Sequence, residues 1–197
     1  ILIPVLGIVC LGLAATTVVS FINSRNALNA NMQLLMRQLL TATGRQIEAW
    51  FADRQLDVEM WAGKPIFQTA VQDTFMGKAA RQSSSGEFEQ LMRKYPHFST
   101  INLMDSNGLV IASSDTDSVA KLSLADREYF KKAMAGSTAL SEVLKSRISG
   151  KPVLAAASPI LDKGQIKGVI SATLDLDYFQ RRLIAPVRLL EKEIGRA

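Results

Sequence analysis

The first 22 residues constrain the chain most strongly because they carry no charged side chain. They read ILIPVLGIVCLGLAATTVVSFI, from Ile1 to Ile22, and the first charge in the chain is Arg25. At about 1.5 Å per residue, a helix of this length can cross a hydrocarbon core of about 30 Å. The run predicts a transmembrane helix over residues 1–22, with a cleaved signal peptide or a buried core helix as alternatives. The chain begins without Met, so we expect it to be part of a longer protein.

Composition removes several function classes. The 197 residues include 23 Lys and Arg, 18 Asp and Glu, one Cys and one His. One Cys and one His cannot form a disulfide, a zinc site or an iron–sulfur site, and a catalytic triad would depend on His97 alone. The sequence also has no Gly-rich phosphate-binding motif, and its basic residues are scattered rather than clustered. We therefore expect no enzyme activity, no cofactor, no metal site and no nucleic-acid partner.

A long helix is predicted between the apolar run and Gly63. Residues 23–62 contain no Pro and only one Gly, and their apolar residues follow a heptad spacing over two heptads: Leu28, Met32, Leu35, Leu39 and Ala42. This seam predicts either a homodimeric coiled coil or packing on the chain's own domain. We expect Trp50 and Trp61, further along, to be packing residues.

Residues 63–177 read as a globular module with helices and strands. A second helical stretch is expected over 65–95, containing a polar loop at 81–86, and another helix over 123–135, with Ser123 and Asp126 as caps and Gly136 at its end. His97, between them, is expected to be exposed or structural. Five segments read as strands joined largely by tight turns: Phe98–Met104, Leu109–Ser113, Ala139–Ser146, Pro152–Leu161 and Gln165–Leu174. The pattern predicts an α+β fold with a five-stranded antiparallel sheet and helices to one side.

The last residues read as a helix leading out of this module. Residues 177–194 have a helical pattern interrupted by Pro186, and Asp175 and Asp177 are expected to cap its start. The expected organisation is therefore a transmembrane helix (1–22), a signalling and dimerisation helix (23–62), the globular module (63–177) and an exit helix or linker (178–197).

An ordered series of short motifs resembles the Cache domain of bacterial chemoreceptors and sensor kinases. The series consists of the hairpin INLMDSNGLVIASS, the segment Asp126–Phe130 (DREYF) with Ala133 and Gly136, and the later GKPV and GVI strands. The resemblance implies a PAS-like sheet set on the long helix, with a small-molecule pocket on one face, outside the cytoplasm. The segment Arg182–Val187 resembles the link out of the membrane-distal half of a double Cache domain, although a single Cache domain remains open.

The resemblance also points to site residues. Arg127 and Tyr129 match an Arg and an aromatic that line the family's pocket, with Phe130 as an aromatic wall or a core residue. A guanidinium can bind a carboxylate through two parallel hydrogen bonds. The alternative is a surface Arg127 paired with Asp126 or Glu128. Further polar contacts are expected from Lys145, Ser146 and Arg147, which precede the GKPV strand, and from Thr173 in the GVI strand. For the first three residues, the alternative is a solvated loop.

The sequence departs from the amino-acid-binding members of the family. Those members use a Tyr and an Asp in the strand after the Arg, and an Asp near the end of the GV strand, to hold the ligand's ammonium group. This chain reads roughly Leu144, Ser146 and Thr173 at these positions. The cations of the expected site remain, which favours an organic acid without an amine. The prediction is therefore an extracytoplasmic, homodimeric sensor of a small carboxylate in a membrane receptor, with chemotaxis as the first choice of output. The alternative is a membrane-tethered module that binds a partner and has no small-molecule ligand.

Overall fold

A single long helix, α1 (Leu2–Ala62), begins the chain. The computed structural model describes residues 2–181, with side chains described from residue 12 onward except for Ala14. Helix α1 ends at the predicted place, because Lys64, which precedes Pro65, is extended with ψ 132°. The expected boundary at residue 22 falls within α1 without a break in the helix.

Among the described residues, no helix is both long enough and apolar enough to span a bilayer.

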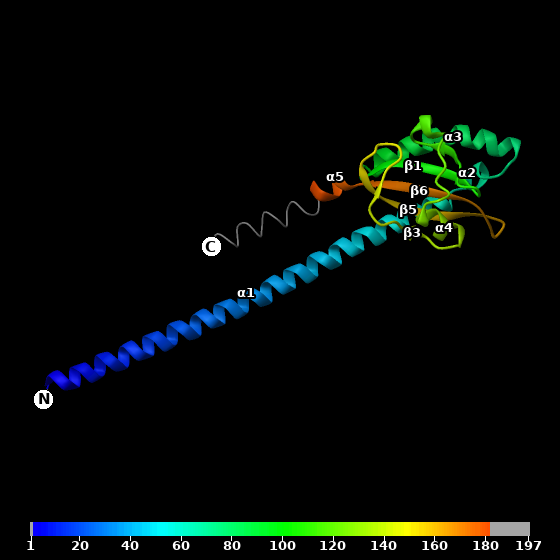
Figure 1. The fold of residues 1–197 in the computed structure, drawn as a ribbon. Coiled ribbons are helices and arrows are strands. Elements are labelled where there is room, and N and C mark those ends of the chain that lie inside the picture. Colours follow the sequence, from blue (N-terminus) through cyan, green and yellow to red (C-terminus); the bar gives the residue numbers. More distant parts are fainter. Residues whose placement is uncertain (1, 182–197) are drawn as a thin grey trace. The chain divides into compact units, whose positions relative to one another are not determined.

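The chain divides into two compact units, at Glu48 and Ala49. The second unit holds the last turns of α1 and all the other elements (Figure 1). Its other helices are α2 (Pro65–Ala70), α3 (Phe75–Lys94), the 3-10 turn η1 (Thr116–Ser118), α4 (Glu128–Met134) and α5 (Leu176–Phe179). Its strands are β1 (Phe98–Asp105), β2 (Val110–Ser113), β3 (Ala139–Leu140), β4 (Leu144–Lys145), β5 (Pro152–Asp162) and β6 (Gln165–Asp175).

The prediction of a polar loop at residues 81–86 is wrong, because these residues lie inside the continuous helix α3. Thr74 caps this helix by accepting a hydrogen bond from the Gly77 amide. Within the segment, the Ser84 hydroxyl donates to the Ala80 carbonyl, and the Arg81 side chain donates to the Ala70 and Gln72 carbonyls at the end of α2. These contacts and the packing of α3 outweigh the low helix propensity of three serines and a glycine.

The sheet is antiparallel throughout, in the order β2-β1-β6-β5-β3. The expected α+β fold with an antiparallel sheet and a long helix is therefore confirmed. The third expected strand is divided into β3 and β4, and both pair with β5. The division has a local cause: the Ser141 hydroxyl, instead of its carbonyl, accepts the hydrogen bond from the Ala155 amide. The regular ladder therefore stops after Leu140.

The two faces of the sheet carry different layers. One face packs against the end of α1 together with α2 and α3, through a core that includes Trp61, Phe67, Phe88, Ile101 and Ile170. The other face is covered by α4 and by the loops beside it, and Figure 1 shows α4 on the opposite side of the sheet from α3. Helices thus lie on both faces rather than on one, because the sheet is apolar on both sides. The smaller layer, around α4, is the one that forms the candidate site.

His97 lies in an aromatic cluster that joins α1 to the exit from the sheet. Trp50 and Phe51 of α1 contact Phe179 of α5, with ring centres 5.4 and 5.2 Å apart, and Trp50 also contacts His97. His97 is therefore structural rather than exposed, with 7% of its surface accessible. The expected packing role of Trp50 and Trp61 is confirmed. Burial, followed by the positive charge of Arg54, lowers the pKa of His97 to about 4.

Acid should destabilise the globular unit through His97. Its ordinary pKa is 6.5 and its folded pKa is about 4, so between these values the unfolded chain binds the extra proton. The free energy of unfolding should therefore fall as pH falls below about 6.5, by roughly 2–3 kcal/mol at pH 4.5. Urea denaturation at pH 7 and pH 4.5 measures this difference. In His97→Phe the loss should be much smaller, and an equal loss in this variant would contradict the assignment.

Candidate functional site

The segment that carries Arg127 is held by the turn between β1 and β2. Gly108, in this turn, has φ +79°, and a Cβ atom built on it would lie 2.6 Å from the Ala125 Cα. The Gly108 carbonyl accepts a hydrogen bond of 2.9 Å from the Leu124 amide. Only glycine permits this close approach. The turn therefore positions the residues just before Arg127.

Helix α4 begins later than expected, at Glu128, with Arg127 as the residue before it. Neither Ser123 nor Asp126 caps the helix, so this part of the prediction is wrong. The Asp126 carboxylate instead pairs with Arg147, and α4 has no side-chain cap. The expected end at Gly136 is confirmed: this residue has φ +96° and donates to the Ala133 carbonyl.

A cavity lies between the sheet, the start of α4 and the loop that follows β4. Its volume is about 20 Å³, which is room for about one water molecule. Twelve residues line it: Asn102, Leu122, Leu124, Arg127, Tyr129, Leu144, Ser146, Arg147, Ile148, Val153, Ala155 and Thr173. Five of the seven predicted site residues are among them. Among these described lining residues none is acidic.

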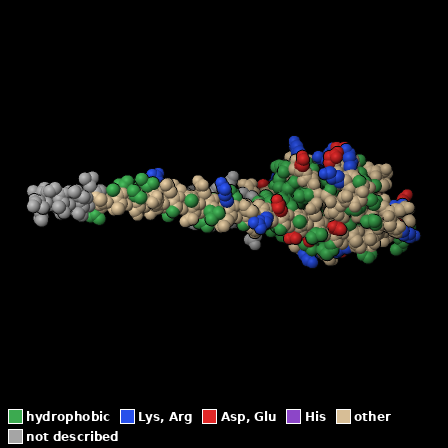
Figure 2. Space-filling model, turned by 90° about the horizontal axis from the view of Figure 1, so that it is seen from below, with side chains coloured by type: hydrophobic (Ala, Val, Ile, Leu, Met, Phe, Trp, Pro, Cys, Tyr) green, Lys and Arg blue, Asp and Glu red, His purple; other side chains and the backbone are tan. Residues whose placement is uncertain are grey.

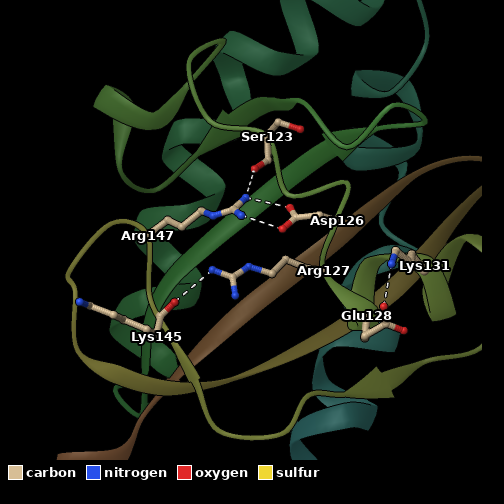
Figure 3. A network of polar contacts seen from close by, with 7 residues as sticks. All are labelled: Ser123, Asp126, Arg127, Glu128, Lys131, Lys145 and Arg147. Carbon is tan, nitrogen blue, oxygen red and sulfur yellow. Dashed lines mark hydrogen bonds and ion pairs between the residues drawn. The ribbon is translucent and has the colours of Figure 1, made fainter.

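Arg127 has no carboxylate partner among the described residues. Its Nη2 atom donates to the Lys145 carbonyl at 3.1 Å, whereas its Nε atom is buried and has no hydrogen-bond partner within residues 2–181 (Figure 3). The alternative pairing with Asp126 or Glu128 is contradicted, since Asp126 binds Arg147 and Glu128 binds Lys131 at 2.7 Å. A buried donor without an acceptor is costly, so this arrangement suits an external acceptor.

Arg147 is already neutralised by a protein carboxylate. Its two terminal nitrogens donate to the two Asp126 oxygens at 2.9 and 2.7 Å, and Nη1 also donates to the Ser123 carbonyl at 2.7 Å (Figure 3). The hydrogen bonds from Arg147 lower the pKa of Asp126, and Asp126 raises the pKa of Arg147 in return. Arg147 thus ties the loop after β4 to the segment before α4, and Arg127 is left as the uncompensated cation of the cavity lining.

The other predicted residues take several positions. Tyr129 lines the cavity, and burial raises its pKa to about 12, so its hydroxyl is neutral and can donate. Phe130 packs in the core beneath α4 and does not line the cavity. The Lys145 side chain is exposed and extends away from Arg127 (Figure 3), and only its carbonyl contacts the guanidinium. The structure therefore does not bring Phe130 or the Lys145 ammonium into the cavity.

Ser146 and Thr173 both line the cavity. The Ser146 hydroxyl accepts hydrogen bonds from the Ile148 and Ser149 amides at 3.2 and 3.1 Å, so it shapes the loop that carries Arg147. Thr173 lies in β6, paired with Thr100 on one side and Ala155 on the other. Leu144, from β4, supplies an apolar wall of the cavity.

Asn102 is a cavity residue that the sequence reasoning missed. It lies in β1, 2% exposed, and its Oδ1 atom accepts a hydrogen bond of 2.7 Å from the Ser113 hydroxyl. A signal existed in the sequence, since Asn102 is an amide in the apolar strand Phe98–Asp105. Buried polar side chains of this kind usually have a specific partner.

Comparison with known proteins identifies the architecture. A family model described as Cache domain (dCache_1) matches residues 24–195. Sporulation kinase D of Bacillus subtilis is 32% identical over 102 residues, which are 50% of this chain and 20% of that kinase. The expected resemblance to Cache sensor domains is therefore confirmed.

Solved sensor domains share the fold. The sensor domain of the Vibrio cholerae histidine kinase DctB has a TM-score of 0.63 at 21% identity, over 72% of this chain and 55% of that one. The ligand-binding domain of the Campylobacter jejuni chemoreceptor Tlp3, in complex with 4-methylisoleucine, has a TM-score of 0.60 at 14% identity, over 73% and 58%. That of the Pseudomonas fluorescens chemoreceptor CtaA, with L-serine, has a TM-score of 0.53 at 20% identity, over 71% and 57%. The chain thus spans a fifth of the kinase and little more than half of each sensor domain.

Proposed function

The chain belongs to the Cache domain family, and we propose that it senses a small organic carboxylate for a bacterial transmembrane receptor. The observation that carries this proposal is the Arg127 guanidinium, whose buried Nε atom has no acceptor within residues 2–181. It lines a cavity whose described residues include no acid. Such a site suits binding rather than catalysis, and its uncompensated charge suits an anion.

The absence of acidic lining residues separates this site from one for amino acids. Solved chemoreceptor domains of the same fold hold isoleucine-like ligands and L-serine. A zwitterion also brings an ammonium group, which needs acceptors with negative charge once water is removed. In this chain Leu144, Ser146 and Thr173 line the cavity instead. We therefore favour a carboxylate without an amine.

Ligand binding within this cavity requires the cavity to widen. A volume of about 20 Å³ is too small for an organic acid, since ligand pockets typically hold about 300 Å³ or more. The loop after β4 lines the cavity through Ser146, Arg147 and Ile148, and the exposed Arg147–Asp126 pair ties it to the segment before α4. A ligand that binds only the open arrangement shifts the equilibrium toward it by its difference in affinity for the two states.

The change can reach the helices through β6. Thr173 lines the cavity, and β6 continues to Asp175, whose carboxylate accepts from the Asp177 and Tyr178 amides and caps α5. Phe179 of α5 stacks on Phe51 of α1. Movement at Thr173 would therefore alter the contact between α1 and the exit from the sheet. The rest of the expected exit helix, including Arg182–Val187, lies outside the described residues.

The receptor context is inferred from the family and from the apolar run. We propose that residues 1–22 anchor the chain in the cell membrane and that the globular unit lies outside the cytoplasm, as the membrane-distal part of a double Cache domain. Residues 23–62 then form the signalling helix, residues 63–177 the sensor and residues 178–197 the link to the membrane-proximal part of the receptor. Chemotaxis is the favoured output, with a histidine kinase or a cyclic-dinucleotide enzyme as alternatives.

The proposed dimer uses the heptad seam of α1. Hydrophobic side chains follow this helix on its surface (Figure 2), and Leu28 and Leu35 are 68% and 60% exposed. Replacing Leu35 and Leu39 by Lys should weaken self-association by at least about tenfold, because charges at a paired seam repel. Sedimentation at several concentrations measures this. Leu34→Lys with Leu40→Lys, two neighbours off the seam, is the matched control. Equal dimerisation of both double variants would contradict the seam.

A thermal-shift screen tests the proposed function. The 197-residue chain in mild detergent is screened against short carboxylates, amino acids, amines and purines. We expect carboxylates to raise the melting temperature, because a ligand that binds only the folded state stabilises it. Stabilisation by amino acids or amines alone would contradict the carboxylate assignment. A response to a protein partner alone would favour the partner-binding module.

A further inference from the structure

The amide of Asn102 has a fixed orientation in the cavity lining. The Ser113 Oγ atom accepts a hydrogen bond from the Asp115 amide at 3.0 Å and lies 2.7 Å from the Asn102 Oδ1 atom. The hydroxyl has one proton, and Oδ1 is the acceptor placed to receive it. The series of hydrogen bonds from the Asp115 amide through the Ser113 hydroxyl therefore ends on the side-chain oxygen of Asn102. The Nδ2 group, with its two hydrogens, makes no hydrogen bond within residues 2–181.

The cavity thus presents donors with different charges. Arg127 supplies one uncompensated positive charge, whereas Arg147 is neutralised by Asp126 and the Lys145 ammonium is exposed. Asn102, from the sheet, lines the same cavity, and its Nδ2 group is a neutral donor. A single uncompensated cation matches a ligand with one negative charge, and a neutral amide donor matches a neutral oxygen acceptor.

We propose that Asn102 is a specificity-determining residue that donates from Nδ2 to a neutral oxygen of the ligand. The preferred ligand is then a short monocarboxylate that also carries an oxo or hydroxyl oxygen. This inference rests on the proposed function, in which Arg127 holds the carboxylate. A ligand that fills the cavity removes water from Nδ2, so an analogue that lacks the second oxygen leaves this donor without an acceptor, and the discrimination should be large.

Four acids with the same three-carbon skeleton test the inference: propionate, pyruvate, L-lactate and L-alanine. Calorimetric titration of the 197-residue chain should give pyruvate or lactate at least about tenfold higher affinity than propionate. Equal affinities for the three amine-free acids would overturn the role of Asn102 and leave the carboxylate assignment intact. Failure of all three to bind, or a preference for L-alanine, would overturn both.

Two variants separate Asn102 from the rest of the site. Asn102→Leu should lower the affinity for pyruvate or lactate to that for propionate. Asn102→Asp keeps the shape and the acceptor for Ser113 but replaces the donor with a carboxylate, so at pH 7.5 it should weaken binding of all three acids at least about tenfold. Asn107→Asp, the same change in the exposed β1–β2 turn, is the matched control. Folded Asn102→Asp that binds all three acids as tightly as the wild type does would overturn the inference.

Discussion

Arg127→Ala should abolish detectable carboxylate binding. The guanidinium is the only uncompensated cation that the structure places in the lining of the cavity, and two hydrogen bonds from it to a carboxylate should contribute roughly 1.5–3 kcal/mol each. Their loss corresponds to about a hundredfold or more in affinity. Calorimetric titration with the best carboxylate of the thermal-shift screen measures the effect. Arg93→Ala removes a guanidinium that is 71% exposed on α3, and this control should bind as the wild type does.

The conservative substitution sharpens this test. Arg127→Lys keeps the positive charge but cannot reproduce the planar pair of donors, so it should restore only part of the affinity. It should also lose the contact to the Lys145 carbonyl, which lies 3.1 Å from Nη2. Full binding by Arg127→Lys would show that charge alone suffices. Full binding by Arg127→Ala would place the carboxylate elsewhere.

Gly108→Ala should both destabilise the globular unit and weaken ligand binding. An alanine at φ +79° costs about 1–2 kcal/mol, and its Cβ atom would also lie 2.6 Å from the Ala125 backbone, which cannot move without shifting the segment before Arg127. We expect a loss of at least about 2 kcal/mol in the free energy of unfolding. Urea denaturation measures the stability, and titration with the same carboxylate measures the binding.

Gly164→Ala is the matched control for this effect. Gly164 has the same φ of +79° in the turn between β5 and β6, but a Cβ atom there would meet nothing within 4 Å. Gly164→Ala should therefore lower the free energy of unfolding only by the cost of the backbone strain, and it should leave the ligand affinity unchanged. Equal effects of the two substitutions on both measurements would mean that the contact between Gly108 and Ala125 does not position Arg127.

Local patterns in the sequence determined most of the fold. The helix break at Gly63–Pro65, the Asn107–Gly108 turn and the five strand segments all follow from short-range preferences, and the structure has them close to the expected positions. The errors occurred where packing or a side-chain hydrogen bond outweighed local propensity. The serine-rich segment 81–86 is helical because α3 is capped and packed, and the third strand is divided because the Ser141 hydroxyl replaces its carbonyl in the ladder.

Only part of the candidate site could be predicted from the sequence. The resemblance of the segment Asp126–Phe130 to the Cache motif predicted Arg127 and Tyr129 as pocket residues, and both line the cavity. The sequence could not decide which partner Asp126 takes, since Arg147 is 21 residues away and reaches it only through the loop after β4. Nor could it place Asn102, on β1, in the same cavity as Thr173, on β6. Such pairings between distant segments depend on strand register and on the path of the loops, which only the tertiary structure specifies. Because Asp126 pairs with Arg147, Arg127 is left as the cation of the cavity lining without a carboxylate partner among the described residues.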